Sequence, residues 1–377
     1  MQVEESRVDA ARVLETFLEA VRIDSPSGEE GRFATWCADH LKDVGCSVRF
    51  DESGSRTESD TGNLIGELPG TDVGMTIVLS AHMDTVEPGR GIRPVVRDGV
   101  VYSEDETILG SDDKAGVAAI VEALQVLHEG SLPHGPVRIL LTTGEELGLQ
   151  GAKALEEAEC TGDLCLVLDA HGPVGGIVTA APTHHTFRAT FRGVAAHAGV
   201  EPEKGIPALL MAANAVSAMR IGRLDDETTA NVGEIRGGRA TNVVAADCLL
   251  TGECRSLDPA KAEAVRSEMD GAMRTAAASL GGTVELRWTK EYDGFRFDES
   301  DPLLGLVEDA CRDIGVEPLR FSTGGGSDGN VLSGKGLKTL VMACGMSEVH
   351  GTSEHVAVAD LEAMARLLLA VLDRAVA

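Results

Sequence analysis

Apolar residues recur along the first part of the chain with two spacings, one helical and one typical of buried strands. The helical spacing predicts helices at residues 7–24, 29–44 and 115–128. Short apolar runs predict strands at residues 48–50, 63–66, 75–80, 137–141 and 164–168, and residues 100–104 resemble one arm of a hairpin. Because strands that are apolar throughout alternate with helices, we expect an α/β domain with a mixed, mainly parallel central sheet.

The spacing changes near Ala180. From there the order strand, helix, strand, strand, helix, strand is predicted, at residues 187–191, 206–219, 231–235, 242–254, 259–280 and 283–288. This order is typical of a small α+β domain of ferredoxin-like topology. The first pattern resumes with helices at residues 303–313 and 359–376 and a strand at 338–343. We therefore expect one domain formed by residues 1–180 and 294–377, with a smaller domain, residues 181–293, inserted within it.

The composition narrows the class of protein. The chain has 377 residues, enough for about two domains. Its 33 basic and 61 acidic residues give a formal net charge of −28, which argues against nucleic acid or an anionic membrane as a partner. No apolar run is long enough for a transmembrane helix, and the acidic N-terminus does not resemble a signal peptide. The eight cysteines include no Cys-x-x-Cys pair, so we expect free thiols in a cytoplasmic, reducing compartment.

Acidic residues and histidines stand at or near the ends of the apolar runs. Those that can bind a cation or move a proton are His82, Asp84, Asp112, Glu145, Glu146, Asp169 and His350. Ligand sites of α/β sheets form where the carboxyl ends of the strands meet. Two zinc ions a few ångström apart need a bridging carboxylate and further imidazole or carboxylate ligands, and this set can supply them.

Two close pairs within this set suggest separate tasks. Asp84 lies two residues after His82, and on an extended chain both side chains face the same way. Asp84 can therefore accept a hydrogen bond from the ring nitrogen of His82 that does not bind metal. Of the adjacent Glu145 and Glu146, one can bind metal while the other acts as general base for an activated water.

Each motif also has an ordinary structural explanation when it is taken alone. His82 alone could belong to a surface turn, and Asp112 could cap the helix that follows it. Glu145, Glu146 and Asp169 could each lie in a solvated turn. Structural roles are expected for Asp113 and Lys114, and the poorer ligand candidates are His171 and His355. The occurrence of all these motifs in one chain favours the metal site.

Three blocks of sequence resemble a known enzyme family. They are Ser80–Val86 (SAHMDTV), Leu109–Gly116 (LGSDDKAG) and Thr143–Gly148 (TGEELG). They resemble the signature blocks of the co-catalytic zinc exopeptidases, which include peptidase T, aminoacylase and succinyl-diaminopimelate desuccinylase. The resemblance runs almost end to end and is strongest to the peptidase T-like tripeptidases. It implies a catalytic domain of the zinc-exopeptidase type and an inserted lid and dimerisation domain.

The resemblance also implies a role for each candidate residue in the metal site. One zinc ion would be bound by His82 and Asp169, and the other by Glu146 and His350. Asp112 would bridge the two ions. Asp84 would orient His82, and Glu145 would be the general base.

Further matches lie in and beside the lid. Gly193–Gly199 contains His197, which in the family reaches across a dimer interface and stabilises the oxyanion in the partner's site. Asn242 and Arg255 would grip a substrate carbonyl or carboxylate, for which the guanidinium fork is suited. Gly325 and Gly326 belong to a loop that resembles a substrate-facing segment and lacks the spacing of a phosphate-binding loop. A homodimer formed through the lid is therefore expected.

The resulting hypothesis is a metal-dependent aminopeptidase acting on short peptides. An N-acyl amino acid deacylase or a dipeptidase could use the same metal site. A non-catalytic peptide-binding relative is disfavoured by Glu145, since a binder needs no base beside the metal. A dinuclear phosphoesterase is disfavoured because Asp112 and Asp169 have no further histidine near them apart from His171, a poorer ligand candidate. Two zinc ions are expected, although cobalt and manganese also suit carboxylate and imidazole ligands.

Overall fold

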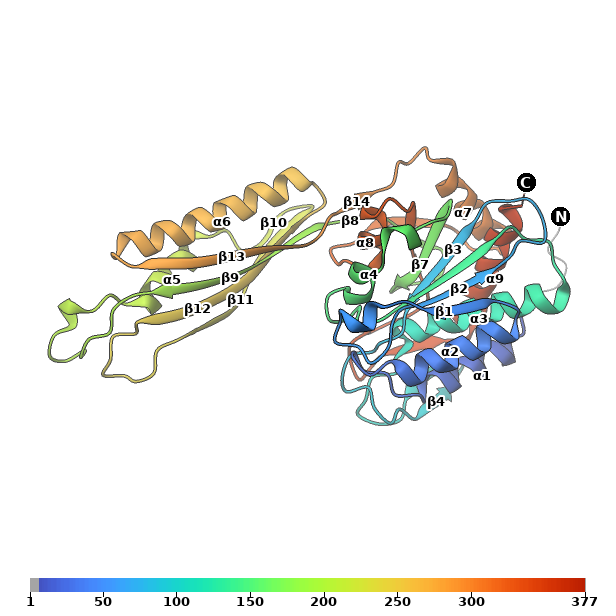
Figure 1. Ribbon diagram of the computed structural model, residues 1–377, viewed down its shortest axis with the longest axis horizontal. Coiled ribbons are helices and arrows are strands. Elements are labelled where there is room, and N and C mark those ends of the chain that lie inside the picture. Colours follow the sequence, from blue (N-terminus) through green and yellow to red (C-terminus); the bar gives the residue numbers. More distant parts are fainter. Residues whose placement is uncertain (1–6, 377) are drawn as a thin grey trace. The chain divides into compact units, whose positions relative to one another are not determined.

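The computed structural model describes residues 7–376, and these residues form two compact units (Figure 1). The first unit contains the described residues up to Thr179, together with Phe297–Ser322 and the described residues from Ser327 onward. The second unit contains Ala180–Arg296 and the short segment Thr323–Gly326. The second unit is therefore inserted within the chain of the first.

The main sheet has nine strands. They are β1 (Ser47–Phe50), β2 (Leu64–Leu68), β3 (Ile77–His82), β6 (Val137–Thr142), β7 (Leu164–Ala170), β8 (Gly176–Ala181), β14 (Phe295–Arg296), β15 (Leu319–Ser322) and β16 (Thr339–Ala343). The order is β1-β2-β6-β3-β7-β16-β8-β14, and β15 pairs with β8. The middle strands β6, β3, β7 and β16 run parallel, whereas β1, β2, β8 and β14 pair antiparallel at the two ends. The predicted mixed α/β sheet with a parallel centre is confirmed.

The parallel strands are apolar because helices and loops cover them. Every residue of β3 is buried, and β6 and β7 have one partly exposed residue each. The helices of this unit are α1 (Ala10–Val21), α2 (Gly31–Asp43), α3 (Ser111–Gly130), α4 (Gln150–Ala154), α7 (Pro302–Asp313), α8 (Asp328–Gly334) and α9 (Val358–Arg374). Residues of α1, α2, α3, α7 and α9 share one core with alternate strand residues such as Ile77 and Leu79. Burial on both faces is what stabilises a parallel sheet.

A small sheet in the order β17-β5-β4 lies beside this core. It consists of β4 (Pro94–Arg97), β5 (Val100–Ser103) and β17 (His355–Ala357), all antiparallel. The hairpin predicted at residues 100–104 is confirmed, while β17 was not predicted because three residues are too few to show a period. The pairing of β17 with β5 fixes the end of the loop that carries His350.

The second unit is a five-stranded antiparallel sheet with two helices (Figure 1). Its strands are β9 (Thr183–Arg192), β10 (Gly222–Asp225), β11 (Thr228–Gly237), β12 (Asp247–Ser256) and β13 (Thr283–Tyr292), and its helices are α5 (Ala208–Ala218) and α6 (Pro259–Ser279). The strand order is β10-β11-β12-β9-β13. Alternate residues of β9, namely Phe187, Ala189 and Phe191, pack in one core with both helices. The predicted α+β arrangement is confirmed, with β10 as an additional short strand.

Three element boundaries differ from the predicted ones at candidate site residues. β7 continues to Ala170, so Asp169 lies inside the strand and not in a turn after it. α3 is assigned from Ser111, but Asp112 and Asp113 have non-helical backbone angles. β12 begins at Asp247, which leaves Asn242 in a loop. Apolar runs mark buried positions, and a polar residue can continue a strand where it faces other polar groups.

Within the described part of the chain, no helix has the length and apolarity needed to cross a membrane.

Candidate metal centre

The candidate ligands of the first unit come from five separate segments that meet at one edge of the main sheet. His82 ends β3, Asp169 is the sixth residue of β7, and Glu145 and Glu146 follow β6. Asp112 lies at the start of α3, and His350 lies in the loop between β16 and β17. Because β3, β6 and β7 are parallel, their carboxyl ends deliver these side chains to the same edge.

Asp112 lies between the two histidines. Its Oδ1 atom is 3.0 Å from His82 Nε2, and its Oδ2 atom is 3.2 Å from His350 Nε2. On the first side, Asp169 Oδ1 is 3.7 Å from the same nitrogen of His82. On the second side, Glu146 Oε1 is 2.8 Å from the same nitrogen of His350. Asp112 therefore contacts both imidazoles, one through each carboxylate oxygen, and each imidazole contacts one further carboxylate. A carboxylate whose two oxygens reach different ligand groups is suited to bridge two ions.

The electrostatics of this cluster favour a cation. Burial and the neighbouring Asp112 carboxylate raise the pKa of Asp169 well above its ordinary value. Hydrogen bonds to Asp112 and Glu146 raise the pKa of His350 to about 10. Burial alone would lower the pKa of His82, but its contacts with Asp112 and Asp84 outweigh burial and raise it. The protein thus holds several carboxylates where burial penalises their charge, and divalent cations would compensate that penalty.

Asp84 supports this site differently from the prediction. The Nδ1 atom of His82 lies 2.9 Å from the main-chain oxygen of Asp84 and 3.5 Å from its carboxylate. The carboxylate instead accepts the N–H groups of Glu145 at 2.9 Å and Glu146 at 3.2 Å, and the hydroxyl of Ser27 at 2.6 Å. Asp84 therefore orients His82 mainly through its backbone, while its side chain holds the loop that carries both glutamates.

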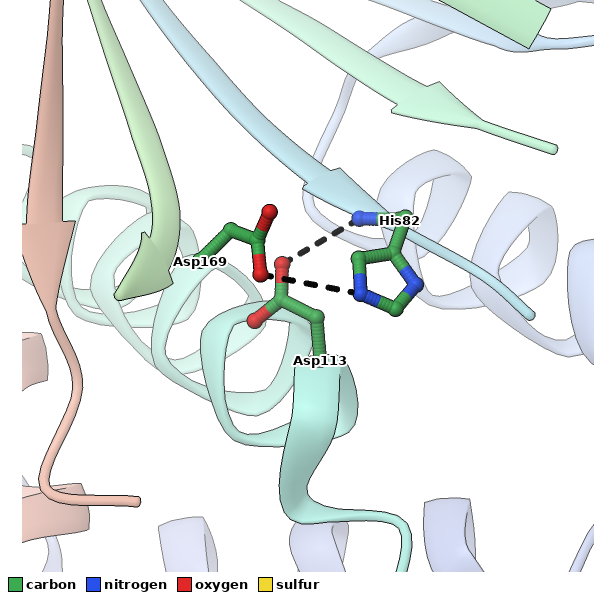
Figure 2. Close-up of side chains that lie close together, drawn as sticks. All are labelled: His82, Asp113 and Asp169. Carbon is green, nitrogen blue, oxygen red and sulfur yellow. Dashed lines mark hydrogen bonds and ion pairs between the residues drawn. The ribbon is translucent and has the colours of Figure 1, made fainter. Parts of the chain in front are cut away.

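Asp113 lies inside the cluster, although a structural role was expected for it. Figure 2 shows its carboxylate between His82 and Asp169. Its Oδ2 atom accepts the N–H of His82 at 3.2 Å, and its buried Oδ1 atom has no hydrogen-bond partner. Ligand atoms of His82, Asp113 and Asp169 lie within 4.8 Å of one another, as do those of His82, Asp112 and Glu146. The sequence feature that could have indicated Asp113 is the pair of adjacent aspartates before a helix. Spacing alone could not tell which of the two faces the histidines.

Two further buried carboxylates near the site were not predicted. Glu30 accepts the N–H of Gly144 at 3.0 Å and the hydroxyl of Ser59 at 2.6 Å. Asp328 accepts the hydroxyl of Thr142, and burial raises the pKa of Asp328 to about 6. Both hold residues just before the Glu145–Glu146 loop. Their sequence surroundings are ordinary, so only the fold reveals these contacts.

In the second unit, His197 and Asn242 lie on adjoining loops. The N–H of Ala198 donates to the main-chain oxygen of Asn242 at 2.9 Å, and His197 forms a β-bridge with Val243. Both His197 and Asn242 are exposed. The structure therefore brings these two residues of the predicted set together on the surface of this unit.

Arg255 lies beside the glycine segment of the second unit. Its Nη1 atom donates to the main-chain oxygen of Gly324 at 3.3 Å, and the N–H of Gly325 donates to the hydroxyl of Thr323 at 3.1 Å. A Cβ atom on Gly326 would lie 2.2 Å from the Tyr292 ring, so glycine is needed there. The guanidinium is also held by both carboxylate oxygens of Glu253, at 3.1 and 3.0 Å. This partner of Arg255 was not predicted.

Comparisons with known proteins identify relatives along the whole chain. The model of Peptidase family M20/M25/M40 matches residues 78–374. The Bacillus subtilis (strain 168) protein named "Uncharacterized protein YqjE" is 42% identical over 98% of this chain and 99% of its own length. The crystal structure of aminopeptidase PepT from Bacillus cereus is 40% identical with a TM-score of 0.93, covering 98% of this chain and 99% of that one.

A tripeptidase structure from Staphylococcus aureus gives the same result. It is 35% identical with a TM-score of 0.94, covering 97% of this chain and 98% of that one. The resemblance to peptidase T-like enzymes is thereby confirmed, and so is the expected class, a peptidase. The chain belongs to Peptidase family M20/M25/M40.

Proposed function

We propose that this protein is a metal-dependent aminopeptidase that hydrolyses short peptides at a dinuclear centre. The observation that carries the proposal is the position of Asp112, whose two carboxylate oxygens each contact a different histidine, while each histidine contacts one further carboxylate. The names of the similar structures, an aminopeptidase and a tripeptidase, support the choice of substrate. His82 and Asp169 would hold one cation, Glu146 and His350 the other, and Asp112 would bridge them.

The donor set fits zinc and also suits cobalt or manganese. It consists of imidazole nitrogens and carboxylate oxygens, with ligand atoms near enough to share a cation. When bound, two such ions would polarise the scissile carbonyl and acidify a water molecule.

Glu145 is the residue we assign as general base. Its backbone is fixed by the Asp84 carboxylate, and burial together with the nearby Asp169 raises the pKa of Glu145. A carboxylate with a raised pKa is a stronger base than an ordinary one and accepts a proton more readily. Glu145 would take the proton from the attacking water and deliver it to the leaving amine.

The second unit would complete the site as a lid. We assign His197 to oxyanion stabilisation in the site of a second copy, and Asn242, Arg255, Gly325 and Gly326 to substrate binding. Exposed apolar residues of this unit support association between copies, among them Leu209 at 40% and Leu210 at 47% exposure on α5. Apolar side chains exposed together on one helix are typical of an interface.

The eight cysteines support a cytoplasmic location. All eight are buried and free. Structural cysteines in an oxidising compartment are normally paired, so unpaired thiols fit a reducing one.

Glu145→Gln tests the proposed function. We expect kcat for tripeptides to fall about 10²- to 10⁴-fold while the metal content stays unchanged, because the base is lost and the ligands are not. Glu157→Gln, which changes an exposed glutamate of the same region, should leave kcat unchanged.

A panel of substrates tests the substrate class. The wild-type enzyme should cleave tripeptides with a free amino group faster than dipeptides, N-acetyl amino acids or N-succinyl amino acids. Full activity of metal-loaded Glu145→Gln would disprove the proposed mechanism, and preference for an acylated substrate would replace the peptidase with a deacylase.

A further inference from the structure

Glu354 is a buried carboxylate that none of the roles above uses. It is 1% exposed and lies in the loop between β16 and β17. Its Oε2 atom accepts the N–H groups of Leu109 at 2.8 Å and Gly110 at 2.9 Å. Its Oε1 atom accepts the hydroxyl of Ser111 at 2.6 Å and the N–H of Asp112 at 3.1 Å. All four donors therefore belong to one short segment, and that segment ends at the proposed bridging ligand.

The loop that carries Glu354 is itself closed at its base. Ser347 and His355 exchange backbone hydrogen bonds in both directions, at 3.0 and 3.1 Å. The N–H of Glu354 donates to the main-chain oxygen of Gly351 at 3.0 Å, which forms a turn next to His350. Because this loop also supplies His350, one side chain connects the two segments that place His350 and Asp112.

We propose that Glu354 is a positioning residue that sets the Asp112 carboxylate relative to His350, so that both reach the same cation. This inference rests on the proposed metal site. A buried carboxylate is costly unless its oxygens are hydrogen-bonded, and here both oxygens have two donors each. Loss of the charge would free Leu109–Asp112 to move away from His350.

The test is the binding of Co²⁺ alone to metal-stripped protein, followed by its visible absorption spectrum. In Glu354→Gln the amide nitrogen has to face N–H donors, so we expect Co²⁺ affinity to fall about tenfold or more. The absorption bands of bound Co²⁺ should also change, because the ligand geometry changes. A role limited to folding would lower the melting temperature of the metal-free protein and leave the affinity and spectrum as they are.

Two more variants make the result decisive. Glu348→Gln removes the same charge from an exposed position of the same loop and should leave Co²⁺ affinity within about twofold. Ser111→Ala removes one of the four hydrogen bonds and should lower the affinity by a smaller factor than Glu354→Gln. If Glu354→Gln does not fold, Ser111→Ala decides the matter, because unchanged affinity there overturns the proposal.

The outcomes separate this inference from the proposed function. Wild-type affinity and spectrum in folded Glu354→Gln overturn the positioning role while the metal site stands. An equal loss in Glu348→Gln also overturns it, since the effect would then come from charge alone. If the wild-type protein binds no Co²⁺, the proposed metal site fails and the role of Glu354 fails with it.

Discussion

Single carboxylates hold much of the local geometry in this protein by accepting N–H and O–H groups. Asp84 accepts the N–H groups of both Glu145 and Glu146, and Glu354 accepts those of Leu109, Gly110 and Asp112. In the second unit, Glu253 pairs with Arg255 and lies 2.9 Å from His184 Nε2. Hydrogen bonds to a carboxylate are strong because the accepting oxygen carries negative charge. Their contribution to the stability of the fold depends on pH, and Glu253 is a suitable residue with which to measure that dependence.

The stability supplied by Glu253 should disappear in acid. The contacts with His184 and Arg255 lower the pKa of Glu253 from its ordinary 4.5 to about 2. A lowered pKa in the folded state means that the stabilisation is complete above pH 4.5 and is lost as pH falls toward 2. We expect Glu253→Gln to lower the free energy of unfolding by about 1–3 kcal/mol at neutral pH.

Denaturant unfolding at about pH 7 and about pH 3 measures this difference, and the gap between variant and wild type should narrow at the lower pH. Glu285→Gln is the control, because the ion pair between Arg192 of β9 and Glu285 of β13 is exposed and should contribute little to stability at either pH. A gap for Glu253→Gln that is the same at both pH values would show that its charge is not the cause.

At the scale of elements, the site depends on how closely α3 approaches β7. Gly116 lies in α3, and a Cβ atom there would be 2.5 Å from Asp113 Oδ1 and 2.8 Å from Leu168 Cβ. Leu168 immediately precedes Asp169, so the contact sets the spacing between the Asp112–Asp113 pair and Asp169. An alanine at this position has to move the helix or the strand.

We expect Gly116→Ala to lower the free energy of unfolding by about 1–3 kcal/mol and to weaken metal binding. Gly305→Ala in α7 is the matched control, since no atom lies within 4 Å of its added Cβ. There the better helix propensity of alanine should stabilise the protein by up to about 1 kcal/mol. Thermal unfolding measures the stability of both variants, and titration with Co²⁺ measures their metal affinity. Unchanged metal affinity in Gly116→Ala would contradict the proposed link between the packing of α3 and the metal site.

The elements also show what the sequence could and could not predict. The parallel strands β3, β6 and β7 were predictable because burial on both faces makes them apolar throughout. The positions of the candidate ligands followed from those strand ends and from the family resemblance. The supporting contacts of Glu30, Glu354 and Asp328 were not predictable, because they join residues far apart in the chain. The position of Asp113 among the candidate ligands was also not predictable, because its orientation depends on local backbone angles that no spacing rule reports.

At the scale of the whole molecule, the two units are expected to cooperate through a second copy of the chain. The assignment of His197 to the partner's site predicts that two inactive variants can complement each other. In a dimer of Glu145→Gln with His197→Ala, one site has both an intact base and an intact partner histidine.

Mixing equal amounts of the two variants under exchanging conditions should therefore restore about a quarter of wild-type activity, since about half of the dimers are mixed and each has one complete site. Light scattering should show a dimer before and after mixing. Activity that stays at the level of the separate variants, in a sample shown to exchange subunits, would place His197 outside the partner's site.

In the proposed function, hydrolysis depends on a pair of cations arranged around Asp112. The most direct test is titration of the metal-stripped protein with Zn²⁺ while tripeptide hydrolysis is followed. We predict no hydrolysis without metal, and an activity that levels off after about two equivalents per chain. Hydrolysis by the stripped protein, or full activity after about one equivalent, would contradict a dinuclear centre.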